Sequence, residues 1–484
     1  MAISEAQDLA QWPTVQAPRL ETERMGRLTG FGMTRHADGY VYRPSSVDEA
    51  RAVFELARSS KRKVVLRGAG RSYGDANIGA ECVVIDNSRM NQILSWDSTT
   101  GVIDAQCGVT IEDLWRHVLE DGWWPPVVSG TMYPTLGGAL AMNIHGKNNF
   151  CAGTLGEHVL ELEILTPSGQ TLILHPSDDA FYAVISSAGL LAMITRVKMQ
   201  MKKIHSGDLR VMPLALKNWD EQFKTFEQFE KNADYMVSWI DCFGSDNGAG
   251  RGLFHAAWYL DEQVAHPATQ QQSHQDLPDT ILGFWPKSIV WRILKKFSNR
   301  MGMRFLNWAK FTSAKKLGNG KPHPQSLVGF SFLLDYVPNW RNAYLPDGFI
   351  QYQCFVPKEH AKQVFDALIK MQQAFSLESY LAVLKRHRPD RFLFSHAVDG
   401  YSLALDFKVT EKNWKKLKEL CHQMNDIVLK AGGRFYFAKD STLRPSDVKA
   451  YLGDEALRKY KELKARFDPD NLLTSELAKR VGLV

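Results

Sequence analysis

The stretch Arg67-Gly-Ala-Gly-Arg-Ser-Tyr-Gly-Asp75 follows a short β-type run, Lys63-Val-Val-Leu-Arg67. Its three glycines, Gly68, Gly70 and Gly74, let the backbone turn tightly and bring main-chain N–H groups close to a ligand. A loop of this kind suits a diphosphate. Its spacing matches neither the dinucleotide-binding fingerprint nor the P-loop, so a plain glycine-rich turn between strands explains the loop equally well when it is taken alone.

A second stretch, Ser129-Gly-Thr-Met-Tyr-Pro-Thr-Leu-Gly-Gly-Ala-Leu-Ala-Met-Asn-Ile-His-Gly-Lys-Asn148, is also rich in glycine and small residues. Gly130, Gly137 and Gly138 again allow close approach of the main chain to a ligand. His145 and Lys147 then place a titratable ring and an amine after a helix of small residues. A single histidine is often structural, so both a structural and a functional role for His145 stay open.

Around these loops the chain alternates between strand and helix patterns. Ser46-Val-Asp-Glu49 forms a capping box in front of a helix that ends near Ser59. Thr110 caps a second helix, which runs to Asp121. Strands are predicted at residues 63–67, 82–86, 102–108 and 196–201, with a hairpin of residues 160–165 and 171–174 around the turn at 167–169.

The composition bounds the class of protein. A length of 484 residues predicts two or three domains, and 44% hydrophobic with 23% charged residues is ordinary for a globular protein. A net charge of +6 is far below that of a nucleic-acid-binding arm, so we expect no nucleic-acid partner. The 6 cysteines are scattered without a CxxC motif, which favours a reduced compartment and predicts no metal site. We expect no secretory signal in the acidic N-terminus and no membrane-spanning helix.

From about Gly207 to Gly432 strands mix with longer helices, a pattern typical of an α+β cap domain. Residues 348–357 alternate as a strand, which puts Gln351 and Gln353 on one face, where paired amides suit the recognition of hydroxyl groups. Lys385 ends another apolar strand. Further elements are predicted as strands at 235–241 and 400–407, a helix at 413–430 and a strand at 431–440 that delivers Lys439 and Asp440 side by side.

One segment of the cap is strongly basic. Residues 280–334 contain no Asp or Glu, and apolar residues within it follow helical spacing from Val290 through Phe297 to Trp308. This pattern predicts one amphipathic helix with basic residues on its other faces. Such a helix is typical of a membrane-surface element; a packed helix with a solvated basic face is the alternative, and both remain open. We expect peripheral membrane contact through about residues 285–311.

Taken together, the motifs resemble the vanillyl-alcohol-oxidase / para-cresol-methylhydroxylase (PCMH) superfamily of flavoproteins. Within it they look most like the decaprenylphosphoryl-β-D-ribose 2′-oxidase family, which oxidises a lipid-linked ribose with FAD. This narrower resemblance is carried by Gly70-Arg-Ser-Tyr-Gly-Asp75, Gly137-Gly-Ala, Ile144-His-Gly-Lys-Asn148, and Ala152-Gly153 through Gly156-Glu-His-Val159. It covers nearly the whole chain, with a divergent patch around 265–325.

The resemblance implies an α+β fold in three parts. A two-subdomain PCMH-type FAD-binding domain would occupy residues 20–204 and a substrate-binding α+β cap residues 205–432. The chain would then return to the FAD-binding domain over residues 433–484, where Arg466-Phe-Asp-Pro-Asp-Asn-Leu-Leu473 is the usual ending of the superfamily.

The resemblance also implies FAD as the cofactor, with the main chain of the two glycine-rich loops around its diphosphate and ribityl chain. Relatives that bind flavin covalently carry a histidine in the pattern Arg-Ser-x-Gly-His; Arg71–Asp75 has none, so we expect non-covalent FAD. The expected cofactor-binding residues are Arg67, Gly68, Ala69, Gly70, Arg71, Ser72, Tyr73, Gly74, Ser129, Gly130, Thr131, Thr135, Gly137, Gly138, Asn143, His145, Gly146, Asn148, Ala152, Gly153, Ile194 and Lys439.

For catalysis the resemblance implies Lys439 at the flavin edge, where a cation would stabilise charge that hydride transfer places on the ring, with His145 and Lys147 nearby. The expected substrate-binding residues are Tyr73, Trp239, Gln351, Gln353, Lys385 and Ser402. The family strand carries Asn and Cys where this chain has Ser402 and Ala404. That departure leaves the exact sugar open and removes a thiol that covalent inhibitors of the family use. The catalytic base is unassigned.

We therefore expect an FAD-dependent oxidoreductase that acts on a CH–OH group. The expected reaction is oxidation of the 2′-hydroxyl of a polyprenylphosphoryl pentose to a ketone by hydride transfer to flavin N5, the first half of an epimerisation in glycolipid biosynthesis. A short-chain reductase would be the partner for the second half, and the expected location is cytoplasmic, at the periphery of the inner membrane. The alternatives are a soluble aldonolactone or alditol oxidase and a non-catalytic flavin-binding subunit at the membrane.

Overall fold

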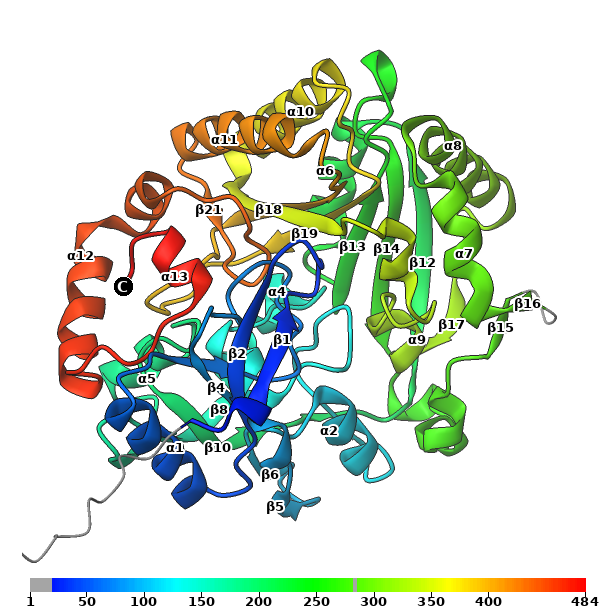
Figure 1. Ribbon diagram of the computed structural model, residues 1–484. Helices are drawn as coiled ribbons and strands as arrows, with labels where there is room; N and C mark the ends of the chain where they lie inside the picture. The colour runs from blue at the N-terminus through cyan, green and yellow to red at the C-terminus, as the bar shows by residue number, and fades with distance from the viewer. Residues whose placement is uncertain (1–19, 282–284) are drawn as a thin grey trace, which may run out of the picture.

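The computed structural model describes residues 20–281 and 285–484, and the predicted N-terminal stretch without a secretory signal lies outside them. The fold is α+β, as predicted, and has two main parts (Figure 1). Two sheets built from residues 25–200 lie beside a larger sheet built from residues 208–435. A continuous apolar core runs through both parts, from Phe54 and Trp115 to Phe365 and Leu420.

The first part contains a four-stranded sheet of order β1-β2-β4-β3 and a five-stranded sheet of order β5-β6-β10-β8-β9. The strands are β1 (Met25–Thr29), β2 (His36–Tyr42), β3 (Val64–Arg67), β4 (Val83–Asp86), β5 (Ile93–Asp97), β6 (Val102–Gln106), β8 (Val159–Leu165), β9 (Thr171–Leu174) and β10 (Met193–Gln200). The short strands β7 (Trp123–Trp124) and β11 (Lys202–Lys203) pair with each other.

Helix starts in this part follow the capping signals of the sequence. Ser46 caps α1 (Val47–Ser59) by accepting from the Glu49 N–H, whereas the Glu49 carboxylate accepts from Ser45 instead of closing a box with Ser46. Thr110 and Asp113 form a complete capping box at α2 (Ile111–Val118). The remaining helices are α3 (Leu136–Ala141), α4 (Asn149–Ala152) and α5 (Asp179–Val184).

The cap is organised around an eight-stranded sheet of order β17-β12-β14-β13-β19-β20-β18-β21. Its strands are β12 (Asp208–Leu216), β13 (Tyr235–Ile240), β14 (Gly252–Tyr259), β17 (His323–Ser326), β18 (Phe349–Pro357), β19 (Leu381–His387), β20 (Gly400–Lys408) and β21 (Arg434–Phe435). One face is covered by α6 (Trp219–Phe229), α10 (Lys358–Ala374) and α11 (Trp414–Lys430) (Figure 1). The other face turns toward the first part.

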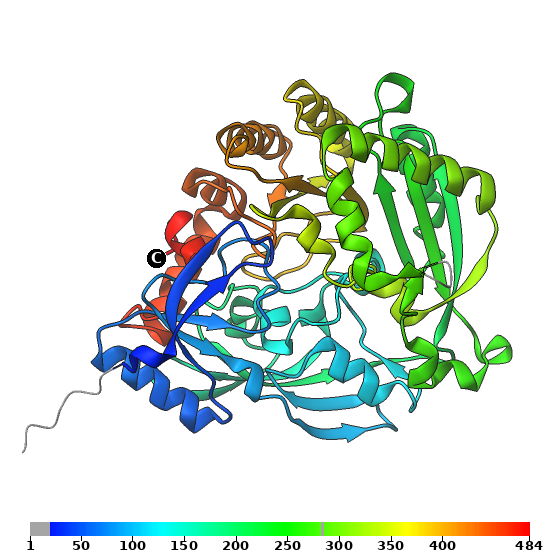
Figure 2. The same ribbon diagram turned by 45° about the vertical axis from the view of Figure 1, so that its right-hand side comes forward.

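The prediction of a single amphipathic helix in the basic segment is wrong, because the structure has two helices there. α7 (Lys287–Phe297) ends before Ser298, and α8 (Arg300–Leu317) starts anew with Asn299 as its N-cap, whose side chain accepts from the Gly302 N–H. Figure 2 shows both helices along the outer side of the cap. Within the described residues no helix is long and apolar enough to cross a membrane.

The chain returns to the first part at its C-terminal end. Here α12 (Pro445–Phe467) packs against α11 and β21, and α13 (Glu476–Arg480) lies between α12 and the four-stranded sheet (Figure 1). Leu473 forms a parallel bridge with Val64, and main-chain hydrogen bonds join Val64 to Leu472 and Thr474. The C-terminal segment therefore extends the edge of the sheet directly in front of the first glycine-rich loop. The division of the chain at residues 204 and 432 stays a prediction.

Candidate active site

A cavity of about 520 Å³ lies between the two parts of the molecule, within the range of roughly 300–1,000 Å³ typical of small-molecule sites. One wall is formed by main chain and small side chains of residues 66–73, 128–147 and 184–194. The opposite wall is the free face of the cap sheet together with Lys439. No Asp or Glu occurs among the described residues that line it, whereas arginine, lysine and histidine side chains reach it from both walls.

The two glycine-rich loops bring unpaired main-chain donors to the same wall. The N–H groups of Ala69 through Ser72, and those of Ser129 through Thr131, donate to no other described residue. The next N–H group in each loop, by contrast, already has a partner. The Tyr73 N–H donates to Ala438 O at 2.8 Å, and the Met132 N–H donates to Asp335 Oδ2 at 2.8 Å. Unpaired N–H groups converging on a cavity form a cradle for an anion such as a diphosphate.

Glycine is required where these loops pack closely against other segments. A Cβ on Gly68 would lie 2.2 Å from Thr135 Oγ1, the N-cap of α3, so this glycine lets the first loop touch the second. A Cβ on Gly74 would lie 2.0 Å from Asp440 O, beside Lys439. Gly70 has φ +66°, a backbone conformation that other residues rarely adopt. The glycines of the first loop therefore allow it to contact both the second loop and the segment that carries Lys439.

Strand alternation arranges the cap wall. In β13 and β14, Trp239 and His255 face the cavity, with Val237 directly opposite His255. In β20 and β18, Ser402 and Gln353 face it, and Ala404 pairs with Gln353. Lys385 of β19 pairs with Ser402. Because alternate residues of adjacent strands share a face, this register collects amides, a hydroxyl and a lysine on one surface.

Gln353 is held by a buried histidine network. Its amide nitrogen lies 3.1 Å from His145 Nε2 and donates to Ser402 Oγ at 3.4 Å. Ser402 Oγ lies 2.8 Å from His387 Nε2, and His145 Nδ1 lies 3.0 Å from His396 Nε2. With the amide donating twice, His145 carries its proton on Nδ1 and the Ser402 hydroxyl donates to His387. This leaves the Gln353 carbonyl oxygen as the group available to a substrate hydroxyl.

Burial keeps these rings neutral. Desolvation, followed by the charge of Lys385, holds the pKa of His145 well below 6.5, and the same two causes lower the pKa of His387. The pKa of Lys385 is lowered by burial to about 8. A neutral His145 positions Gln353 without adding charge beneath the substrate, so the cationic groups of the pocket are its lysines and arginines.

Lys439 faces a buried carboxyl group. Its ammonium lies 3.7 Å from the centroid of the Tyr73 ring, and Asp406 of β20 accepts from Gln351 Nε2 at 2.5 Å. The Tyr73 hydroxyl and the second oxygen of Asp406 are buried and have no partner within the described structure. Burial lowers the pKa of Lys439 and raises that of Asp406, and each partially offsets the shift of the other. Burial in the wall of the cavity thus favours the neutral form of the Lys439 amine.

Lys439 lies in a turn, and the prediction of a strand over 431–440 is wrong. The strand β21 ends at Phe435; the Lys439 N–H donates to Tyr436 O at 3.0 Å and the Asp440 N–H to Phe437 O at 3.3 Å. The turn leaves the sheet because Tyr73 N–H, from the glycine-rich loop, pairs with Ala438 O. That hydrogen bond ties Lys439 to the first loop.

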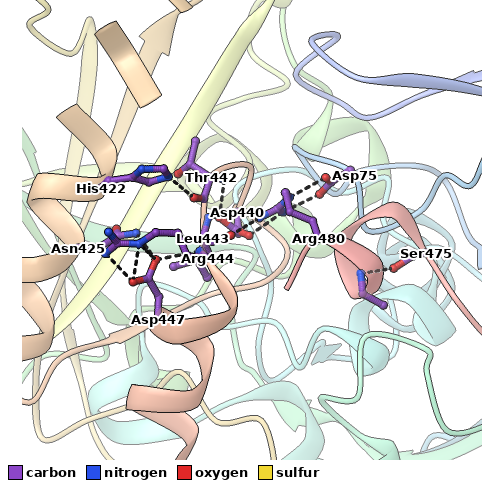
Figure 3. Close-up of polar contacts among 11 residues, drawn as sticks. Asp75, His422, Asn425, Asp440, Thr442, Leu443, Arg444, Asp447, Ser475 and Arg480 are labelled. Atoms are coloured by element: carbon purple, nitrogen blue, oxygen red, sulfur yellow. Dashed lines mark hydrogen bonds and ion pairs between the residues drawn. The ribbon is translucent and has the colours of Figure 1, made fainter. Parts of the chain in front are cut away.

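A guanidinium clamp holds this arrangement from the C-terminal segment (Figure 3). Arg480 of α13 makes a two-pronged ion pair with Asp75 at 2.8 and 2.9 Å, and donates to Asp440 Oδ2 at 2.8 Å. It also donates to Leu443 O at 2.8 Å. Both carboxylates are buried. One side chain therefore fixes the end of the first loop against the residue next to Lys439.

The structure brings most of the predicted site residues to the cavity. The lining includes Arg67, Gly68, Ala69, Gly70, Arg71, Ser72, Tyr73, Ser129, Gly130, Thr131, Thr135, Gly137, Gly138, His145, Lys147, Ile194, Trp239, Gln351, Gln353, Lys385, Ser402 and Lys439. The guanidinium of Arg67, however, donates to Asn77 Oδ1 at 2.6 Å and to the main-chain carbonyls of Asn77 and Thr29. It braces the loop from within.

Six predicted residues lie behind the wall: Gly74, Asn143, Gly146, Asn148, Ala152 and Gly153. Asn143 Oδ1 accepts from the Gly156 N–H at 3.0 Å, and Asn148 Nδ2 donates to Pro126 O at 2.8 Å. These side chains hold loops that shape the cavity without reaching it.

Several residues in and around the cavity were not predicted from the sequence: His255 and Lys310 line it, whereas Asp406, His387 and His396 are not part of its lining. Asp406 lies two residues beyond Ala404, so strand alternation, counted from the positions that the resemblance singled out at Ser402 and Ala404, predicts that it shares their face of β20. His255 and Lys310 gave no such signal, because their approach to Trp239 depends on the pairing of β13 with β14 and on the packing of α8. His387 and His396 likewise gave none, since they meet His145 only in the folded chain.

Comparison with known proteins also points to a flavin-binding oxidase. Residues 39–175 match the family of FAD binding domains. The decaprenylphosphoryl-beta-D-ribose oxidase of Mycolicibacterium smegmatis is 29% identical over 469 residues, which cover 95% of this chain and 98% of the relative. The L-gulonolactone oxidase of Mus musculus is 21% identical over 456 residues, 91% and 94% of the two chains. The putative D-arabinono-1,4-lactone oxidase of Neurospora crassa is 28% identical over 232 residues, 46% and 39%.

An FAD binding domain that contributes one wall of a deep cavity, with unpaired N–H donors where a diphosphate would lie, makes this chain an FAD-dependent oxidoreductase. The predicted resemblance to PCMH-type flavoproteins, and among them to decaprenylphosphoryl-ribose oxidase, is confirmed, and so is FAD as the cofactor. The cradle of Ala69–Ser72 and Ser129–Thr131 is the part of the chain that would hold the diphosphate.

The flavin is expected to leave the protein on acid precipitation. Asp75 stands where covalently linked relatives carry histidine, and its carboxylate is committed to Arg480. No cysteine is among the described lining residues. The supernatant of trichloroacetic-acid-precipitated protein should therefore contain the flavin absorbance, and a yellow pellet with a colourless supernatant would contradict non-covalent binding.

Proposed function

We propose that the protein oxidises the 2′-hydroxyl of a polyprenylphosphoryl pentose to a ketone, as the first half of an epimerisation that a short-chain reductase completes. The observation that carries the proposal is the cap wall. It offers amides for hydroxyl groups and lysines for a phosphate, with no described carboxylate lining the cavity that would repel one. The full-length similarity to decaprenylphosphoryl-beta-D-ribose oxidase supports it.

Oxidation of an alcohol removes a hydride from carbon and a proton from oxygen. Bound FAD supplies the hydride acceptor. The chain must supply the proton acceptor, and we assign it to Lys439, because burial favours the neutral amine and the side chain lies against Tyr73 in the cavity. Taking the proton makes Lys439 cationic. The carbonyl oxygen of Gln353, fixed by His145 and Ser402, would orient a second sugar hydroxyl.

The test is an anaerobic absorbance titration of the FAD-loaded protein with a polyprenylphosphoryl pentose, beside an aldonolactone and a free alditol. Loss of the yellow flavin band with the lipid-linked sugar alone is the expected result. Bleaching with the lactone or alditol alone would favour the alternative of an aldonolactone or alditol oxidase; two of the relatives are lactone oxidases by name. A flavin that no sugar reduces would leave a non-catalytic flavin-binding subunit.

We further propose that α7 and α8 rest on an anionic lipid surface. Their outward side exposes Met301 (84%), Phe305 (55%) and Trp308 (52%), which are spaced by four and three residues and so share one face of α8. Basic residues surround them, and the two helices contain no Asp or Glu. Exposed aromatic residues with a basic surround suit the headgroup region of anionic lipids.

Vesicle binding tests this surface. The protein should sediment with vesicles of anionic phosphatidylglycerol and much less with phosphatidylcholine, and added salt should release it. Phe305→Ser with Trp308→Ser should weaken sedimentation about tenfold or more, because each removes an inserted aromatic side chain. The double change Leu94→Ser and Ile173→Ser, on exposed apolar residues of the first part, is the matched control. Equal losses in both double variants would contradict the proposed surface.

A further inference from the structure

Three basic side chains of the cavity, Lys147, His255 and Lys310, lie outside the cradle of unpaired N–H groups. Lys147 follows the second loop and donates to Phe330 O, with its ammonium 4.3 Å from the Phe330 ring centroid. His255 faces the cavity from β14, and Lys310 reaches it from α8. The unpaired N–H groups expected to bind the cofactor diphosphate are those of Ala69–Ser72 and Ser129–Thr131, so these three side chains have no anion assigned to them.

Lys147 and Lys310 are both close enough to His255 for their charges to act on it. The charges of Lys147 and Lys310, after burial, lower the pKa of His255 to about 4. Burial and the neighbouring Lys385 lower the pKa of Lys147 to about 7. No carboxylate lines this part of the cavity among the described residues. Two lysines beside an imidazole, with no counter-charge near them, attract an anion, and a bound anion would in turn favour their protonated forms.

The surroundings fix where these cations sit. The Lys310 ammonium lies 4.4 Å from the centroid of the Trp239 ring, which is buried in the cap wall. The helix that carries it is anchored by Asn307, whose side chain donates to the buried Asp241 at 3.1 Å. Asp241 also pairs with Arg251. Lys310 is therefore held over Trp239 by a rigid helix.

We propose that Lys147, His255 and Lys310 form a subsite for the phosphate group of a lipid-linked substrate, with Trp239 beside it. The subsite rests on the proposed function and extends it, since it divides the cavity into a sugar region at Gln353 and Lys439 and a phosphate region at α8. A phosphodiester has oxygen acceptors for two ammonium groups and an imidazole N–H.

This placement gives the lipid chain an exit. Leu333, Leu334 and Tyr336 line the cavity, and Leu333 is 54% and Tyr336 37% exposed, so they lie where the cavity opens. The same α8 that supplies Lys310 to the inside exposes Met301, Phe305 and Trp308 on the outside. A prenyl chain leaving the phosphate would pass an apolar rim before it reaches the surface proposed to contact lipid.

Isothermal titration of the FAD-loaded protein with farnesyl phosphate tests the subsite without turnover. Farnesol is the neutral control ligand and inorganic phosphate the free-anion control. Lys310→Gln and His255→Gln should each weaken farnesyl phosphate binding about tenfold or more, as expected for the loss of one hydrogen bond to a charged group, and leave farnesol unchanged. Lys315→Gln, on an exposed lysine of the same helix, should bind like the parent protein.

Equal weakening in Lys315→Gln, or no weakening in Lys310→Gln and His255→Gln, would overturn the subsite. Inorganic phosphate binding as tightly as farnesyl phosphate would assign the groups to a free anion and also overturn it. The binding result is independent of the proposed reaction. Protein that binds farnesyl phosphate through Lys310, yet whose flavin no polyprenylphosphoryl pentose reduces, would retain the subsite and lose the proposed substrate.

Discussion

Replacing Lys439 with methionine is expected to slow flavin reduction by the lipid-linked sugar by about 10²–10⁴-fold, the usual worth of a positioned proton acceptor. Methionine fills a similar space beside the Tyr73 ring but cannot take the substrate proton. Stopped-flow absorbance under anaerobic conditions measures the reduction rate directly. The flavin content and the melting temperature of the variant serve as controls, because they should stay close to those of the parent protein.

The pH dependence of flavin reduction in the parent protein is a second test of Lys439 as the proton acceptor. Burial lowers the pKa of Lys439, while Asp406 raises it and Lys385 lowers it further. The neutral amine is the form that accepts a proton, so the reduction rate should rise with pH and be lost as pH falls through this lowered pKa, well below the ordinary 10.5 of a lysine. In Lys439→Met the reduction rate should no longer rise with pH over this range. A variant that keeps the parent's pH profile would assign the proton to another group.

Replacing Arg480 with methionine is expected to destabilise the protein by about 3–5 kcal/mol, the cost of removing one partner from a buried ion pair. The change leaves Asp75 and Asp440 buried without their cation. Urea unfolding of the FAD-loaded protein measures the free energy. FAD affinity should fall as well, because the clamp holds the first glycine-rich loop against the Lys439 turn.

Arg458→Met is the matched control for this change. Arg458 pairs with Glu462 within α12, and both side chains are more than half exposed, so its loss should cost less than about 1 kcal/mol. A similar small loss for Arg480→Met would show that the clamp contributes little to stability or to the shape of the loop.

Much of the fold follows from local signals in the sequence. The capping residues Ser46 and Thr110, and the alternating apolar patterns of the strands, mark elements whose boundaries depend on neighbours in the chain. The two glycine-rich loops could also be recognised from the sequence, because their glycines stand close together in the chain. Gly68 and Gly74 are required by contacts with distant segments, yet a glycine is visible in a sequence whatever its partner.

The parts that could not be predicted depend on long-range contacts. The Lys439 turn replaces a strand because Ala438 pairs with Tyr73 across the molecule. The break between α7 and α8 was hidden because the apolar spacing continues through Ser298 and Asn299. Arg480 gave no signal, since its carboxylate partners are remote in sequence. Asp406 was within reach of strand alternation and was overlooked.

The clamp joins residues that are 405 positions apart in the chain. A nascent polypeptide therefore cannot secure the first glycine-rich loop when its sheet emerges from the ribosome; the loop must wait until Arg480 has been synthesised. During that interval the edge of the sheet at Val64 also lacks its partner Leu473, and unpaired strand edges favour aggregation during slow, non-local folding. Production of active protein should then depend on how quickly synthesis and cofactor capture follow one another in the cell.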